Sequence, residues 1–133
     1  MAQIRLKLFD KAQNFVITNS TASTNLITYA VPTATMVQMY ARVLAWKDNP
    51  AENYPCATWV FTNSFKRGTG SVAFIGSSTT DQNIDHRDDT GITSATAVSA
   101  VSGGNILINV TGTATYYIFW YALVDFTVTG PQI

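Results

Sequence analysis

Residues Asn109–Thr129, NVTGTATYYIFWYALVDFTVT, form the longest apolar and aromatic stretch of the sequence and decide its fold class. After a break at Gly112 the stretch alternates between two sets of side chains, and alternate residues of a β-strand face opposite sides. One set is wholly apolar: Ile118, Trp120, Ala122, Val124, Phe126 and Val128. The other set is mixed: Tyr117, Phe119, Tyr121, Leu123, Asp125 and Thr127. A strand that is apolar on both faces lies between two packed sheets or against another subunit.

The N-terminal residues show the same alternation over a shorter length. Residues 3–9 place Ile4, Leu6 and Leu8 on one face, which predicts a half-buried strand. Residues 10–14 are polar turn formers, so we expect a turn there and a second short strand over residues 15–18. The first strand is free to act as an assembly arm that pairs with a neighbouring protein.

The middle of the chain continues the pattern. Segment 35–46 is rich in Met, Ala and Leu, which favour helix, but it lacks a capping signal, and its period of two favours a strand. Residues 58–67 and 71–75 flank Gly68-Thr-Gly70 and predict a β-hairpin. About eight to ten strands at a spacing of roughly 8–12 residues predict an all-β fold. We therefore expect an antiparallel, jelly-roll-like β-sandwich that forms one domain over residues 1–133.

Charge is scarce and balanced. Charged residues make up 12% of the chain, about half the roughly 25% of an average globular protein, and eight Lys and Arg balance eight Asp and Glu. A neutral surface rich in hydroxyl groups suits a protein that neighbours cover in an assembly, and it equally suits an extracellular β domain. The basic residues are scattered, which argues against nucleic acid as a partner. No apolar run approaches the roughly 20 residues of a membrane helix, and Arg5, Lys7 and Asp10 interrupt any secretion signal.

Candidate chemistry is confined to one acidic segment, Asp81–Asp89, which holds half of the acidic residues and the only histidine, His86. Its spacing does not match a calcium loop, and Arg87 would oppose a cation, so we expect a solvated polar loop and no metal. No serine sits in a nucleophile elbow, and Cys56 follows proline without a catalytic context. No glycine-rich loop precedes a helix. We expect no cofactor and no catalytic residues.

Residues 57–129 carry three features in a fixed order. A tryptophan strand runs into a basic pair and a glycine turn (Trp59 to Gly70), a polar acid-containing loop follows (Thr79 to Asp89), and a strand ending in Val-Thr-Gly112 leads to an aromatic strand. This order resembles the C-terminal β domain of phage tail fibres and related head-decoration proteins. The segment ahead of it is neither a fibre shaft nor a repeat, which favours a compact, stand-alone virion component.

The resemblance implies a non-enzymatic virion structural protein. We expect a homotrimer that decorates the capsid or forms a head fibre, with the major capsid protein or other virion proteins as partners. Its subunit or capsid interface would use apolar strand faces: Ile4, Leu6, Leu8, Tyr117, Phe119, Tyr121 and Leu123.

Two other functions stay open. The first is a receptor-binding knob of a tail tip that grips host glycan or protein through Trp46, Tyr54, Asp85 and His86. Aromatic rings near loops stack on sugars, although most aromatic residues serve cores and interfaces. The second is a hydrolytic enzyme that acts through the acidic segment around Asp85 and His86.

Overall fold

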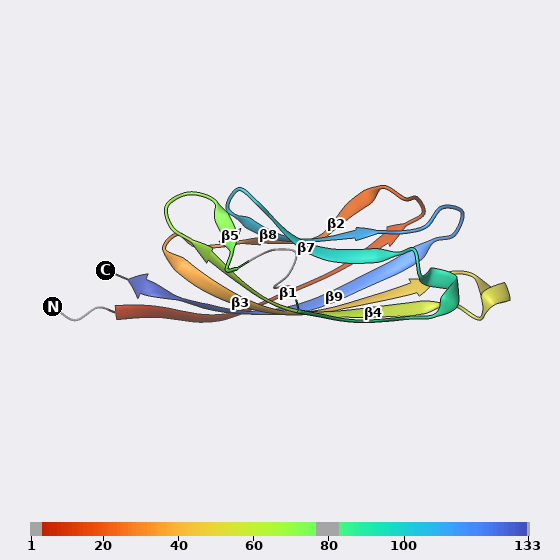
Figure 1. Cartoon of the computed structure of the whole chain (residues 1–133), viewed down its shortest axis with the longest axis horizontal. Coiled ribbons are helices and arrows are strands. Elements are labelled where there is room, and N and C mark those ends of the chain that lie inside the picture. Colours follow the sequence, from red (N-terminus) through yellow and green to blue (C-terminus); the bar gives the residue numbers. More distant parts are fainter. Residues whose placement is uncertain (1–3, 77–82, 133) are drawn as a thin grey trace.

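The computed structural model describes residues 4–76 and 83–132 and shows a two-layered all-β molecule (Figure 1). Its strands are β1 (Ile4–Thr18), β2 (Ser23–Ala30), β3 (Thr35–Lys47), β4 (Cys56–Arg67), β5 (Val72–Phe74), β6 (Asn83–Asp88), β7 (Thr96–Ser102), β8 (Asn105–Thr111) and β9 (Ile118–Gln132). Two short 3-10 turns are η1 (Pro50–Glu52) and η2 (Thr90–Ile92). Every pairing between the described strands is antiparallel, so the prediction of an antiparallel β-sandwich is confirmed.

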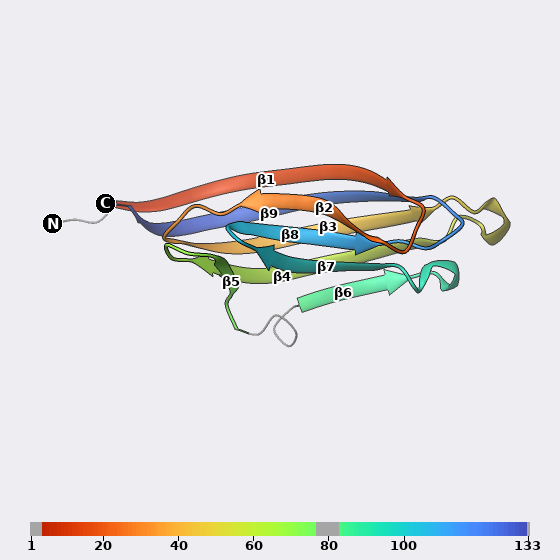
Figure 2. The same ribbon diagram turned by 90° about the horizontal axis from the view of Figure 1, so that it is seen from above.

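The two layers differ in size. The larger sheet has the order β1-β9-β3-β4-β5, and β6 also pairs with β4. The smaller sheet has the order β2-β8-β7 and covers only one face of the larger one (Figures 1 and 2). The larger sheet therefore has an inner face, against the smaller sheet, and an outer face that no second sheet covers among the described residues.

Most of the stretch that decides the fold class forms β9, an internal strand of the larger sheet. Strand β9 is flanked by β1 on one side and by β3 on the other. Its wholly apolar set of side chains is buried on the inner face, including Trp120 and Phe126. Strand β3 alternates strictly between buried and exposed residues, which confirms the strand predicted for segment 35–46. The core is completed by Phe61 and Phe65 of β4 and by apolar residues of the smaller sheet such as Ile108.

The first strand is longer than the sequence predicts. Residues 4–18 form one continuous strand whose register with β9 runs through fifteen pairs without a shift, so the turn predicted at 10–14 is wrong. The polar residues fit a strand because β1 lies at the edge of the sheet, where polar groups reach solvent or local partners. Lys11 approaches Asp125 on the outer face, and the Asn14 amide donates to the Leu26 carbonyl on the inner side.

The acidic segment is not wholly a loop. Asn83–Asp88 forms β6, which pairs with β4 over the part of that strand that β5 does not reach, whereas Asp81 lies outside the described residues. The exposed backbone edge of β4 recruits these polar residues into the sheet, and this overrides their weak intrinsic strand preference. Within residues 4–76 and 83–132, no helix is long and apolar enough to cross a membrane.

Candidate functional site: the outer face of the larger sheet

The outer face of the larger sheet is divided into an apolar end and a polar middle. Strand register aligns its side chains in rows that cross β1, β9, β3 and β4. One row contains Ile17, Phe119, Trp46 and Cys56, and the next contains Phe15, Tyr121, Leu44 and Thr58. These two neighbouring rows bring together apolar residues from strands far apart in the sequence.

We define the aromatic patch as the apolar residues of these rows together with Tyr54, which stacks on them. Its members are Phe15, Ile17, Leu44, Trp46, Tyr54, Phe119 and Tyr121. All except the half-buried Phe119 expose 39% to 52% of their surface. The rings are in mutual contact, since the Phe119 centroid lies 5.1 Å from that of Trp46 and 6.1 Å from that of Phe15. Scattered single apolar residues are normal on a protein surface, whereas a joined set of this kind marks an interaction site.

The loop after β3 places Tyr54 over the patch. Asn53 and Tyr54 adopt left-handed backbone conformations with φ of 59° and 52°, which turn the chain back after η1. The Tyr54 ring then stacks on Trp46 with centroids 4.9 Å apart and planes 13° apart. Buried Lys47 anchors the loop, because its Nζ donates to the Glu52 carboxylate at 3.2 Å and to the Gly91 carbonyl at 2.8 Å. The Trp46–Tyr54 pair is therefore held by backbone geometry and an ion pair.

A shallow hollow of about 350 Å³ opens in the aromatic patch. Its lining is almost entirely apolar and comes from four strands: Phe15, Leu44, Ala45, Trp46, Cys56, Ala57, Thr58, Phe119 and Tyr121. A hollow without polar groups that fix orientation fits an apolar side chain of a partner better than a polar small molecule.

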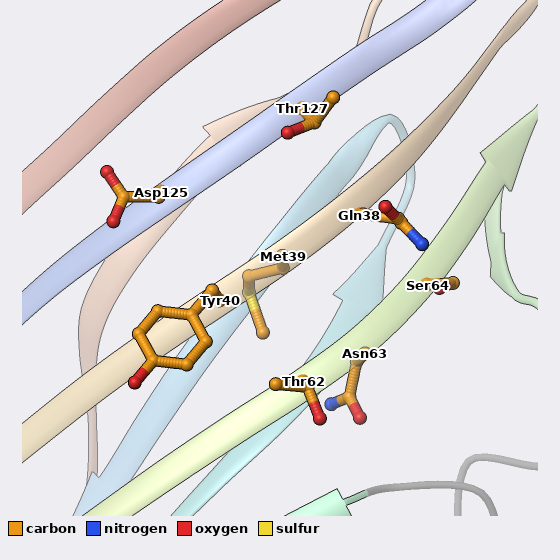
Figure 3. A pocket seen from close by; sticks show the side chains of 8 residues that line it. All are labelled: Gln38, Met39, Tyr40, Thr62, Asn63, Ser64, Asp125 and Thr127. Carbon is orange, nitrogen blue, oxygen red and sulfur yellow. The ribbon is translucent and has the colours of Figure 1, made fainter.

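A second hollow, of about 320 Å³, lies in the polar middle of the same face (Figure 3). We call it the polar hollow; its outward-facing side chains are Gln38, Tyr40, Thr62, Ser64, Asp125 and Thr127. Lys11 and Arg42 approach the Asp125 carboxylate at 3.9 and 3.8 Å, and Arg42 also lies 5.6 Å from the centre of the Tyr40 ring. Hydroxyls, an amide, a carboxylate and one aromatic ring are groups that hydrogen-bond and stack with sugars.

The predicted interface residues are split between the two faces and one end of the larger sheet. Phe119, Tyr121 and Leu123 lie together on the outer face of β9, while Tyr117 precedes the strand and is exposed. Leu8 is paired with buried Val128 and therefore lies toward the inner face, at the exposed rim of the sheet. Ile4 and Leu6 belong to β1, where they pair with Gln132 and Gly130.

The predicted ligand-contact residues form two separate groups. Trp46 and Tyr54 come together in the aromatic patch, whereas Asp85 and His86 lie on β6. As neighbours in a strand, Asp85 and His86 point to opposite sides. His86 stacks on Trp59 with centroids 4.7 Å apart, and its Nε2 lies 3.4 Å from Asp88, while Asp85 lies 3.8 Å from Arg87. The two side chains do not converge on one point where a reacting group would sit.

Cys56 lies at the margin of the patch, and its thiol is poorly activated. Burial, and then the nearby Asp89 carboxylate, raise the pKa of the Cys56 thiol, and a thiol is nucleophilic only as its thiolate. Among the described residues, no three His, Cys, Asp or Glu side chains gather as a metal site requires.

Sequence reasoning missed three members of the aromatic patch: Phe15, Ile17 and Leu44. The expected turn at residues 10–14 concealed that Phe9, Phe15 and Ile17 share one face of a single strand. Leu44 alternates in step with Trp46, so its face was visible in the sequence, but only the register of β3 with β9 places it beside Tyr121.

Two comparisons with known proteins found no match for this chain. No protein-family model matches it. No curated protein sequence matches it significantly either.

Proposed function

We propose that this chain is a non-enzymatic structural protein of a phage virion, which works by assembling with copies of itself and with the particle surface. The virion setting, and the trimer as its assembly, rest on the resemblance of residues 57–129 to phage fibre and decoration domains. The role as a capsid decoration or head-fibre protein is mechanical: the chain coats or stabilises a particle by burying apolar surface against its neighbours.

The aromatic patch is the observation that carries the proposal. Six of its side chains leave roughly 500 Å² of joined apolar area exposed, taking about 200 Å² for a whole side chain of this size. That area is near the upper end of the roughly 300–600 Å² found for the largest patch on a monomer, which is often functional. It is also more than half of the ~800 Å² that each partner buries in a standard interface. A chain with so little charge gains stability and solubility by covering such a patch in an assembly.

The first experiment is native mass spectrometry of the intact chain and of the variant Leu44→Lys. Leu44 lies in the apolar hollow, so an ammonium group there would be buried without a partner in the assembly, and the variant should dissociate. Val98→Lys is the matched control, because Val98 is equally exposed but lies on the smaller sheet. A wild-type chain that is monomeric at every concentration would contradict the proposal.

The second experiment tests the virion setting. Purified chain is mixed with phage capsids that lack their decoration protein, and the bound copies are counted after sedimentation. Stoichiometric binding that Leu44→Lys weakens and Val98→Lys preserves is the expected result. Absence of stoichiometric binding counts against the capsid-decoration role.

The polar hollow favours one alternative, a receptor-binding knob for host glycan. It offers sugar-compatible hydroxyl and amide groups next to Tyr40, and the Trp46–Tyr54 stack lies further along the same face. This function predicts saturable binding to host cells or glycan arrays that Trp46→Ala or Tyr54→Ala abolishes. The matched control is Tyr117→Ala, which removes an exposed tyrosine outside the polar hollow and the Trp46–Tyr54 stack.

A further inference from the structure

The outer edge of the larger sheet is formed by a long and regular strand. Among the described strands β1 pairs only with β9, and Figure 2 shows β1 as the rim of the molecule, with no strand beyond it. Proteins usually shorten such edges or interrupt them with proline or a bulge, because an exposed edge recruits further strands. Strand β1 is fifteen residues long, contains no proline, and shows no shift in its register.

We propose that β1 pairs with β1 of a second copy of this chain, antiparallel and about a two-fold axis that passes beside Ala12. The proposal deepens the proposed function, on which it rests for self-association, by naming the strand and register that join two copies. A two-fold axis perpendicular to the sheet keeps the outer faces of both copies on the same side, and it makes residue i oppose residue 24 − i.

Over residues 8–16 this register matches like with like along the joint, and Lys7 falls opposite Ile17 only toward its end. On the outer face Phe9 lies opposite Phe15 of the second copy, and Lys11 lies opposite Gln13. No pair in this register sets two like charges opposite each other. Phe9 and Phe15 are 71% and 52% exposed, and aromatic cross-strand pairs stabilise antiparallel strands.

On the inner face Leu8 lies opposite Val16, Asp10 lies opposite Asn14, and the two Ala12 residues face each other. Leu8 is 41% exposed although it faces the core layer, because none of the described strands lies beyond it at the rim. Pairing with a second β1 supplies that strand. The small Ala12 side chains allow close approach of the two strands at the axis.

The two neighbouring registers fit less well. An axis beside Lys11 sets the two Lys11 ammonium groups directly opposite each other, which is destabilising. An axis beside Gln13 sets the Asp10 carboxylate opposite Val16 and Lys11 opposite Phe15, so that each charge loses water next to an apolar group. Over residues 8–16 only the axis at Ala12 avoids both faults, so the distribution of charge in the middle of β1 selects it.

Strand direction also favours pairing of β1 with β1 of a second copy over pairing of β1 with β6. The free side of β6 is the other long edge position, but β6 runs in the same direction as β1 in the sheet. Copies that joined β1 to β6 around a ring would pair these strands in parallel, which is slightly less stable per residue. Pairing β1 with itself is antiparallel, and it brings Phe9 of the second copy next to Phe15 at the margin of the aromatic patch.

Disulfide trapping tests the axis directly. In the background Cys56→Ser, which removes the native thiol, Ala12→Cys places two thiols across the axis. Opposed residues in antiparallel strands have Cα atoms about 4.5–5.5 Å apart, within the roughly 4.4–6.8 Å that disulfides span. Mild oxidation should link most chains into covalent dimers. The control Ala73→Cys lies on exposed β5 at the opposite side of the sheet and should link only slowly; equal rates at both positions would overturn the proposal.

Charge exchange tests the register. Phe9→Glu and Phe15→Lys, each alone, put an unpaired charge into the joint and should slow disulfide formation through Ala12→Cys. Combined in one chain, the two substitutions place a carboxylate at position 9 opposite an ammonium at position 15 twice per joint, and the rate seen with Ala12→Cys alone should return. Cross-linking is the readout because it reports the β1 joint by itself, whereas Phe15 also lines the hollow of the aromatic patch. Failure of the combined variant to recover cross-linking would overturn the register.

The number of copies separates this inference from the proposed function. A β1 joint gives an even number, two copies, or six if the aromatic patch also forms trimers. A wild-type particle of three copies that still binds capsids would leave the proposed function intact and overturn the β1 joint. Assemblies with an even number of copies that cross-link through Ala12→Cys but never bind capsids would support the β1 joint and count against the virion role.

Discussion

At the scale of single residues, the buried polar contacts of this sandwich lie where strands of the larger sheet meet neighbouring segments. The Trp120 indole N–H donates to the Thr18 hydroxyl at 2.9 Å, and both residues are buried. This bond joins the end of β1 to the centre of the stretch that decides the fold. A second hydrogen bond joins the two layers. The Asn63 side-chain amide of β4 donates to the Ser99 hydroxyl of β7.

The variant Thr18→Val should reduce the free energy of unfolding by about 1–3 kcal/mol, because it leaves the buried indole N–H without an acceptor at nearly constant volume. Urea denaturation followed by tryptophan fluorescence measures the loss. Thr21→Val, at an exposed position, is the matched control and should stay within about 0.5 kcal/mol of wild type. Equal stabilities of the two variants would show that the indole finds another partner.

Tyr29 should make stability fall at alkaline pH. Burial, the Asp10 charge and a hydrogen bond with Asp10 raise the pKa of Tyr29 from about 10 to about 12. Because the folded-state pKa exceeds the unfolded value, this contribution is complete below pH 10 and is lost as the pH rises from 10 through 12. Tyr29→Phe should therefore show a shallower loss of stability across that window in urea titrations, and equal slopes would contradict the assignment.

At the scale of elements, alternation predicted the central strands well and the edges poorly. Strands β3, β4 and β9 are half or fully buried, so apolar periodicity marks them clearly. The polar middle of β1 predicts a turn, and the polar residues of β6 predict a loop. Both form strands, because edge strands owe their conformation to the neighbour that they pair with. Their sequences carry only a weak signal of that neighbour.

Gly130 controls how closely β9 and the turn before β3 approach each other. A Cβ at this position would collide with the Ala34 carbonyl oxygen and lie 3.1 Å from the Thr35 Cα. Gly130→Ala should therefore reduce the free energy of unfolding by about 1–3 kcal/mol, as overpacking does in tight interiors. Gly68→Ala is the matched control, because nothing lies within 4 Å of its added Cβ. Chemical denaturation measures the free energy of unfolding of both variants. Similar losses for both would argue against the close approach.

At the scale of the whole molecule, the sandwich is asymmetric. The smaller sheet shields one face of the larger sheet (Figure 1). The polar hollow (Figure 3) and the aromatic patch lie on the other face. The neutral overall charge offers no long-range repulsion between copies. These features together make self-association the main expectation for the intact chain.

Thermal stability should therefore depend on protein concentration. If copies associate only when folded, mass action raises Tm as the concentration rises. Leu44→Lys should weaken this dependence, because it removes the association through the aromatic patch, while its dilute-limit Tm stays close to that of wild type, because Leu44 is already half exposed in one chain. Scanning calorimetry over a hundredfold range of concentration measures both, and a Tm of wild type that is independent of concentration would contradict self-association.

The sequence by itself determined the all-β class, the hairpin at Gly68-Thr-Gly70, the two-faced character of Ile118–Val128 and the apolar nature of Phe119 and Tyr121. These properties are local, since period-two alternation and turn chemistry depend on residues close together in the chain. Only the tertiary structure decided which face the second sheet covers, and only it joined Phe15, Leu44 and Tyr121 into one patch. That outcome depends on register between strands up to about a hundred residues apart, and no local pattern encodes such pairing.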